Sequence, residues 1–182
     1  MPPAPSFYKP LPNPTQPTNH PTNHPPTQGA VYGDVKPANF LFTSSPDAAQ
    51  AAGDPPPLLK MVDVGCSQWC RPGRPLKSRT GTPVYLAPEV LLREWGPAAD
   101  LWSVGMVAFH LSAGRLPFWS SLEGLTPKSV MQAILADPID YGLLSGGPAQ
   151  ADLLRGLLDH SPACRPSAAD ALRHPWFVEM GV

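Results

Sequence analysis

The sequence has few charged residues and few cysteines, and each shortage excludes a class of protein. Charged residues make up 15% of the chain and its net charge is −1, so nothing indicates nucleic acid or an anionic membrane as a partner. Three cysteines are too few for a four-ligand zinc site, and they favour reduced thiols inside a cell. The N-terminus lacks the features of a signal peptide, and no later apolar run is long enough to span a membrane. These absences predict a cytoplasmic protein, with the nucleus as the alternative.

Residues 1–29 have almost no apolar residues at a helix or strand period. They contain ten of the 27 prolines and one charged residue, Lys9, which predicts a disordered tail. A Pro-Thr-Asn-His repeat spaces His20 and His24 four residues apart, but the prolines forbid the helix on which the two would share a metal. The P-x-x-P spacing, which occurs in this tail, would suit an SH3- or WW-type partner. An inert tail is the preferred interpretation.

One helix, predicted over residues 98–113, organises the rest of the chain. Pro97 suits a first helical position, Asp100 places a carboxylate in the first turn, and Gly114 suits a left-handed stop. Apolar side chains point around its whole circumference: Leu101, Trp102, Val104, Met106, Val107, Ala108, Phe109 and Leu111. A helix of this length that is apolar on every side is buried in a soluble domain.

Two short apolar runs predict a β-hairpin. Phe40 to Phe42 is the first strand, residues 58–62 are the second, and a proline- and alanine-rich stretch separates them. The pairing would bring Asn39 and Asp63 to the same end of the hairpin. We expect that end to hold a cation.

Three more helices are predicted from their end signals. Thr126 followed by Pro127 starts a helix through about Ala136. A second spans residues 148–158 and carries leucines on one face. The last begins after Ser167, which forms a capping box with Asp170, and ends near residue 173.

Several stretches, in this order along the chain, resemble the protein kinases. The family's catalytic loop HRDLKPEN is matched by YGDVKPAN at 32–39, and its DFG is matched by Asp63-Val64-Gly65. Its APE is matched by Ala87-Pro88-Glu89, and the stretch 157–177 is similar to its last helices. We call residues 63–89, between the second and third motifs, the activation segment.

The resemblance implies a fold and a class of enzyme. Residues 30–182 would form a mainly α-helical kinase C-lobe, with helices around a buried central helix, a small β-hairpin at the active site and no N-lobe. Lys36 and the Gly81-Thr82 pair resemble serine/threonine kinases, and the strings NFLF and HPWF are most like calcium/calmodulin-dependent and plant calcium-dependent kinases. No EF-hand loop follows, so calcium would not be sensed within this chain.

The resemblance also implies roles for individual residues. Asp34 would be the catalytic base that accepts the proton of the attacking hydroxyl, and Lys36 would steady the transferred phosphate. Asn39 and Asp63 would bind Mg²⁺, so that Lys36, Asn39 and Asp63 together would hold ATP and Mg²⁺. Thr82 would lie beside the acceptor hydroxyl of a protein substrate. Glu89 and Arg165 would form a buried ion pair.

The chain departs from the family pattern in ways that leave alternatives open. Gly33 replaces the motif's arginine, Val64 its phenylalanine and Ala38 its glutamate, and no G-x-G-x-x-G occurs in the sequence. Without the helix that normally precedes the loop, the central helix should leave an apolar groove uncovered. The alternatives to an active kinase are an inactive pseudokinase or scaffold, a truncated fragment without the ATP-covering lobe, and a protein whose proline-rich tail is its functional part.

Overall fold

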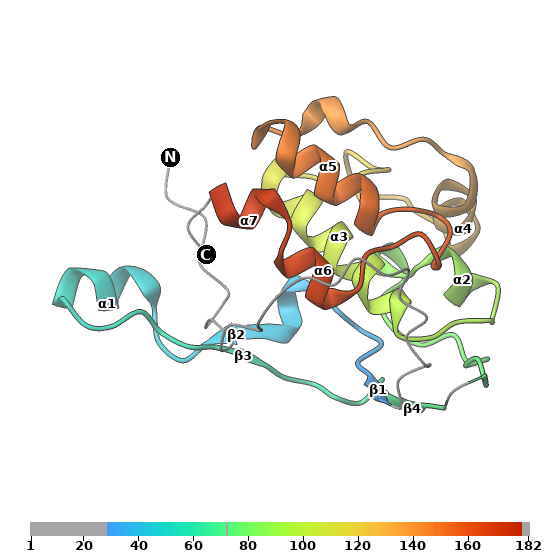
Figure 1. The fold of residues 1–182 in the computed structure, drawn as a ribbon, viewed down its shortest axis with the longest axis horizontal. Coiled ribbons are helices and arrows are strands. Elements are labelled where there is room, and N and C mark those ends of the chain that lie inside the picture. The colour runs from blue at the N-terminus through green and yellow to red at the C-terminus, as the bar shows by residue number, and fades with distance from the viewer. Residues whose placement is uncertain (1–28, 72, 180–182) are drawn as a thin grey trace.

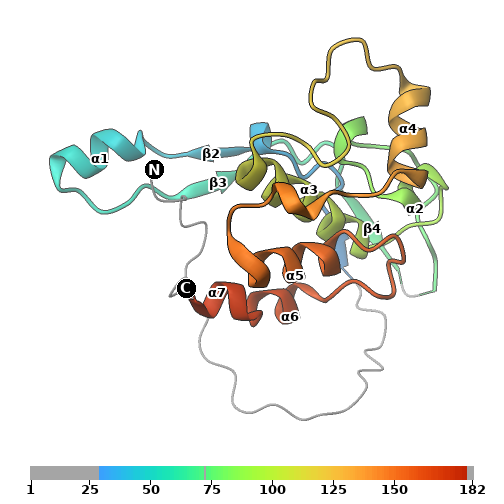
Figure 2. The same ribbon diagram turned by 90° about the horizontal axis from the view of Figure 1, so that it is seen from above.

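The computed structural model describes residues 29–71 and 73–179. The predicted tail, its two histidines and its P-x-x-P spacing lie outside this range, apart from Gly29. Helices surround one central helix, and two small antiparallel sheets lie beside them (Figures 1 and 2). Among the described helices, none is both long and apolar enough to cross a bilayer. All three cysteines have free thiols.

The elements follow the predicted order. The helices are α1 (Pro46–Ala52), α2 (Pro88–Leu91), α3 (Ala98–Ala113), α4 (Pro127–Ala136), α5 (Gly147–Leu157), α6 (Ala168–Leu172) and α7 (Pro175–Glu179). The strands are β1 (Gly29–Val31), β2 (Phe40–Phe42), β3 (Leu59–Met61) and β4 (Gln68–Cys70), and short 3-10 turns lie at Pro37–Asn39, Pro83–Tyr85 and Tyr141–Leu143. The predicted α3, α4, α5 and α6 are confirmed to within about one residue at each end, which is within the usual uncertainty of helix boundaries.

Helix α3 is the core of the molecule, but the prediction that it is buried on all sides is wrong. Trp102, Met106 and Phe109 are fully buried, and Gly114 ends the helix at φ 71°. Val104 and Leu111, however, are 41% and 57% exposed. The described elements pack against the rest of the helix and leave this face open.

A glycine allows α5 to approach α3 closely. A Cβ added at Gly105 would lie 2.9 Å from the Leu158 side chain and 3.0 Å from that of Leu157. Both leucines are buried in the core. A larger side chain at this position would therefore push α5 away from α3.

The β2–β3 hairpin forms as predicted, with Phe40 opposite Met61 and Phe42 opposite Leu59. The prediction missed α1, which lies in the stretch between the two strands. The Ser45 side chain accepts a hydrogen bond from Ala48 N at the start of α1, and Gly53 ends it at φ 72°. Both views show α1 and the hairpin projecting away from the helical body (Figures 1 and 2).

Strands β1 and β4 and helix α7 were not predicted either. Strands β1 and β4 pair antiparallel, with Gly29 opposite Cys70 and Val31 opposite Gln68. Each strand has only three residues, which is too short for a period-2 pattern to be visible in the sequence. Pro175 begins the short helix α7, since proline is favoured in the first turn of a helix.

Candidate active site at the end of the hairpin

The catalytic loop, residues 32–39, is anchored to α3 through one carboxylate. Asp100 accepts hydrogen bonds from the backbone N–H groups of Tyr32 (2.8 Å) and Gly33 (2.9 Å). Burial raises the pKa of the Asp100 carboxyl, and the two N–H donors partly offset that rise. The expectation that Asp100 only complements its own helix was incomplete, because its carboxylate fixes the loop to the core.

Asp34 is buried within the loop and held by donors on several sides. Its Oδ1 accepts from Thr82 N and from Thr82 Oγ1, each at 2.7 Å. Its Oδ2 lies 2.7 Å from Lys36 Nζ and accepts from Asn39 Nδ2 at 3.1 Å. Burial alone would raise the pKa of Asp34, but the donors from Lys36, Thr82 and Asn39 hold it below its ordinary value of 3.8. The side chain is therefore an oriented, ionised carboxylate.

Lys36 connects the loop to the activation segment. Its Nζ lies between the Asp34 carboxylate and Thr82 Oγ1, to which it donates at 2.8 Å. The hydrogen bond to Asp34 raises the pKa of Lys36 above its ordinary value of 10.5. The ammonium is thus a fixed positive charge beside the carboxylate, where it can stabilise a transferring anionic group.

Asn39 and Asp63 lie at the same end of the hairpin, as predicted. Asn39 is buried, and its side-chain Nδ2 donates to the Asp34 backbone carbonyl at 2.9 Å. Its backbone carbonyl accepts from Val62 N, also at 2.9 Å. Asp63 follows directly, exposed and at φ 57°, and its Oδ1 accepts from Gly65 N at 3.2 Å.

These two side chains fit Mg²⁺ rather than a softer metal. A carboxylate and an amide oxygen suit a hard cation that keeps several of its waters. Within residues 29–71 and 73–179 no three His, Cys, Asp or Glu side chains gather at one point, so a cage made only of such ligands is not formed there. A small number of oxygen ligands at an exposed end is the arrangement that Mg²⁺ accepts.

The activation segment packs directly on the catalytic loop. Gly81 has φ 102°, and a Cβ there would lie only 2.4 Å from the Gly33 carbonyl oxygen. Ser67 Oγ also donates to the Tyr32 carbonyl, at 3.3 Å. Sequence reasoning missed this contact between two glycines, because no local pattern connects positions so far apart along the chain.

Gly33 is built into this packing. Its φ is 80°, and a Cβ there would lie 2.8 Å from the Cys66 carbonyl oxygen. An arginine, the family residue at this position, would need the backbone of the activation segment to shift. Glycine in place of the family's arginine therefore removes a charge and also allows this close packing of the two backbones.

The predicted pair between Glu89 and Arg165 is confirmed. Arg165 Nη2 lies 2.8 Å from Glu89 Oε2, both side chains are buried, and the guanidinium also donates to the carbonyls of Ala98 and Asp159 at 2.8 Å each. It lies over the Trp102 ring at 5.2 Å. The end of the activation segment is thus joined to α3 and to the chain before α6.

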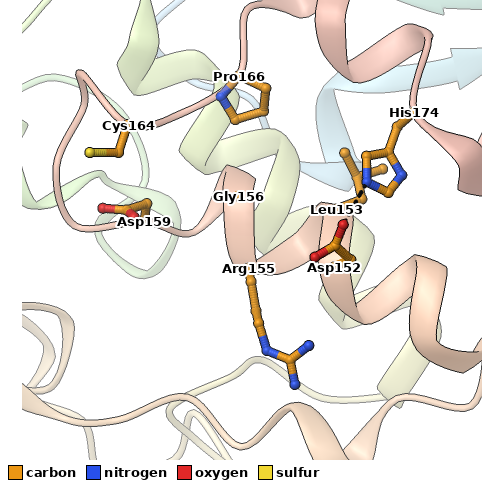
Figure 3. Close-up of a pocket in the computed structure, with 8 residues that line it drawn as sticks. All are labelled: Asp152, Leu153, Arg155, Gly156, Asp159, Cys164, Pro166 and His174. Carbon is orange, nitrogen blue, oxygen red and sulfur yellow. Dashed lines mark hydrogen bonds and ion pairs between the residues drawn. The ribbon is translucent and has the colours of Figure 1, made fainter.

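A separate open pocket of about 420 Å³ lies along α5, away from the catalytic loop (Figure 3). His174 and Asp152 approach each other at its edge, with 3.2 Å between Nε2 and Oδ2. None of the predicted site residues lines it. The chemistry of the loop, rather than the size of a hollow, therefore identifies the candidate site.

Comparison with known proteins agrees with this geometry. The family model for the protein kinase domain matches residues 23–177. CDPK-related kinase 5 from Arabidopsis thaliana is 40% identical over 153 residues, which cover 84% of this chain and 24% of that protein. Calcium-dependent protein kinase 6 from Arabidopsis thaliana is 36% identical over 159 residues, which cover 85% of this chain and 27% of that protein. Calcium-dependent protein kinase 9 from Oryza sativa subsp. japonica is 37% identical over 151 residues, which cover 81% of this chain and 24% of that protein.

The chain spans about a quarter of the length of these curated relatives. The family match, in contrast, covers most of the chain, including the catalytic loop, the activation segment and all the helices that support them. The chain therefore belongs to the protein kinase family, as a serine/threonine kinase domain that resembles those of the plant calcium-dependent kinases.

Proposed function

We propose that this chain is the C-lobe of a serine/threonine protein kinase, which transfers the γ-phosphate of ATP to a protein Ser or Thr hydroxyl. It would carry the residues that bind the acceptor hydroxyl and the metal. The observation that carries the proposal is the Asp34 carboxylate, which is buried, ionised and aimed by Lys36, Thr82 and Asn39. An oriented carboxylate of this kind can accept a hydroxyl proton as the oxygen attacks phosphorus.

The other residues have supporting roles in the proposal. Lys36 provides a fixed positive charge where negative charge gathers on the transferring group. Asn39 and Asp63 would hold Mg²⁺, which when bound neutralises phosphate charge. Asp100 holds the loop against α3, so that the carboxylate keeps its position without help from solvent.

Phosphate transfer from radiolabelled ATP to a generic Ser/Thr protein substrate tests the proposal. We expect a weak signal from this chain, because its sequence contains no Gly-rich loop over the phosphates. The signal should fall by about 10²–10⁴-fold in Asp34→Asn, the range for loss of a general base, and be lost in Asp63→Ala. Asp47→Ala, an exposed aspartate on α1, is the matched control. Equal signal in all four proteins would remove the enzyme interpretation.

A non-catalytic scaffold is the second candidate, and the exposed apolar residues favour it. Leu41, Met61 and Val64 are 54%, 52% and 63% exposed on and beside the hairpin. Exposed apolar side chains gathered on one small element are a feature of protein interaction sites. If the chain binds a hydrophobic dye and shows no site-dependent transfer, the scaffold or fragment interpretation is preferred.

Two further points remain proposals. The division into a proline-rich tail at 1–29 and a C-lobe at 30–182 is one of them. A cytoplasmic or nuclear location, and an SH3- or WW-type partner for the tail, stay predictions from composition.

A further inference from the structure

The activation segment carries a local positive charge that the catalytic site does not use. Residues 66–88 contain four basic residues and no acidic residue, although the whole chain has a net charge of −1. Two of the four have structural partners: Lys77 lies 3.7 Å from Glu94, and Arg79 donates to the Leu91 carbonyl at 3.0 Å. Arg71 and Arg74 are exposed.

These two arginines lie opposite each other. The Arg74 backbone N–H donates to the Arg71 carbonyl at 3.0 Å, and the two residues form an antiparallel bridge. Residues directly opposite in such a pair share a face, where like charges destabilise the pairing. In the part of the chain that the structure describes, no carboxylate lies within ion-pair distance of either guanidinium. A bound anion would relieve this repulsion.

Trp69 extends the same face. It lies two residues before Arg71 along an extended segment, so both side chains point to the same side. Cys70, between them, packs against the hydrophobic core, and that contact directs its two neighbours outward. Trp69 is 78% exposed. We call Trp69, Arg71 and Arg74 the cationic face.

The cationic face is continuous with the catalytic loop. Strand β4 pairs with β1, which leads directly into the loop, and Figure 1 shows the two strands side by side. Trp69 lies opposite Ala30 and Cys70 opposite Gly29, so the chain from Gly29 to Asp34 spans at most about 17 Å, the reach of five extended residues, and Arg71 lies one residue farther along. An acceptor peptide would cross this distance within about five residues of its hydroxyl.

We propose that the cationic face selects protein substrates with acidic residues within about five positions of the accepted Ser or Thr. The inference deepens the proposed kinase function and rests on it. Each arginine presents a planar fork of donors that fits a carboxylate in two-point contact. Trp69 offers a flat apolar surface for the peptide between the acidic residue and the hydroxyl.

A binding measurement tests this without requiring catalysis. Fluorescent Ser peptides of equal length, one rich in Glu, one in Gln and one in Arg, are titrated with the full chain and followed by anisotropy. The Glu peptide should bind about tenfold more tightly than the Gln peptide, as expected for two exposed charge pairs. The advantage should shrink in about 1 M salt, where screening acts within about 3 Å.

Variants separate the cationic face from general charge. Arg71→Glu/Arg74→Glu should reverse the order of the Glu and Arg peptides, and Arg71→Gln/Arg74→Gln should make all three bind alike. Lys128→Glu, an exposed basic residue on α4, is the matched control and should change nothing. Trp69→Ala should weaken all three peptides by a similar factor. Because both arginine side chains are exposed, these variants should keep the wild-type circular dichroism spectrum.

The outcomes distinguish this inference from the proposed function. If the Glu peptide has no advantage, or if anionic vesicles bind with the same arginine dependence while the peptide does not, the inference is wrong. Arginine-dependent peptide binding without site-dependent phosphate transfer would support the cationic face and contradict the kinase activity. Transfer with equal preference for all three peptides would do the reverse.

Discussion

The helical body, formed by α2 to α7, and the β2–β3 hairpin differ in how far their apolar side chains are buried. In the body, Trp102 and Met106 on α3 are fully buried, whereas Leu41 and Met61 on the hairpin are more than half exposed. The candidate site lies where the two regions meet. Asp34 and Asn39 are therefore held by contacts with the body and with each other, whereas Asp63 lies exposed at the end of the hairpin.

Two carboxylates show the same contrast at atomic scale. Asp34 accepts from Thr82 twice, from Asn39 and from Lys36, all within the body and the activation segment. Asp63 is exposed and accepts from Gly65 N. One part of the candidate site is thus preorganised by the chain's own hydrogen bonds, while Asp63 is open to solvent.

The largest effect on the body should come from breaking its buried ion pair. Arg165→Ala leaves Glu89 buried without its partner, so the free energy of unfolding should fall by about 4 kcal/mol. Arg173→Ala removes an arginine paired with Asp170 at the surface and should lower it by less than about 1 kcal/mol. Urea denaturation compares the two. Similar losses would mean that Arg165 does not join the activation segment to the core.

A smaller loss is expected where the activation segment meets the catalytic loop. Gly81→Ala combines a left-handed backbone with a clash against the Gly33 carbonyl, so it should cost about 3 kcal/mol. Gly53→Ala is the control: its φ is also positive, but nothing lies within 4 Å, and it should cost only about 1 kcal/mol. If thermal denaturation gives the same loss for both, the two backbones do not touch in solution.

Thr82, together with Lys36 and Asn39, holds the pKa of Asp34 low. Thr82→Val removes the hydroxyl donor, so the free energy of unfolding should fall by about 1.5 kcal/mol and the pKa of Asp34 should rise. Because that pKa lies below 3.8 when folded, the stability from Asp34 is complete above pH 3.8 and is lost as the pH falls through the folded value. Denaturation at about pH 6 and about pH 3 should show a smaller pH-dependent loss in Thr82→Val. An unchanged pH dependence would contradict the contact.

The hairpin should be the least sensitive region. Leu41→Ser and Met61→Ser replace exposed apolar side chains, so each should change the free energy of unfolding by less than about 0.5 kcal/mol while reducing the binding of a hydrophobic dye. Leu154→Ser, in the buried core, is the contrasting control. A large loss of stability in the hairpin variants would show that this surface is covered in solution.

Local signals in the sequence were enough for the main elements. The bounds of α3 followed from Gly114 and the proline before the helix, and α4 followed from Thr126 and Pro127. Which face of α3 is buried could not be predicted as well. Val104 is as apolar as Met106, and only the packing of other elements exposes the first and buries the second. All four strands have three residues and none shows a period, but β2 and β3 lie in runs of large apolar residues, whereas β1 (GAV) and β4 (QWC) do not and were missed.

For the candidate site, too, local motifs were predictable from the sequence and long-range contacts were not. The spacing of Asp34, Asn39 and Asp63 in the family motifs was sufficient to bring them to one place, and the structure puts them at one end of the hairpin. The contact between Asp34 and Thr82 joins residues 48 positions apart, and no local pattern reports such a distance. The same holds for Asp100, which looked like a helix-start residue and instead binds the loop.

The most direct test of the account is the titration of the Asp34 carboxyl by carbon NMR, with Asp34→Asn used to assign its signal. The account predicts a pKa below 3.8 in the full chain, and a higher value in Thr82→Val, because Lys36 and Thr82 hold the carboxylate ionised. A pKa at or above 3.8 in the unmodified chain would contradict it, since the base side of the site would then not be preorganised.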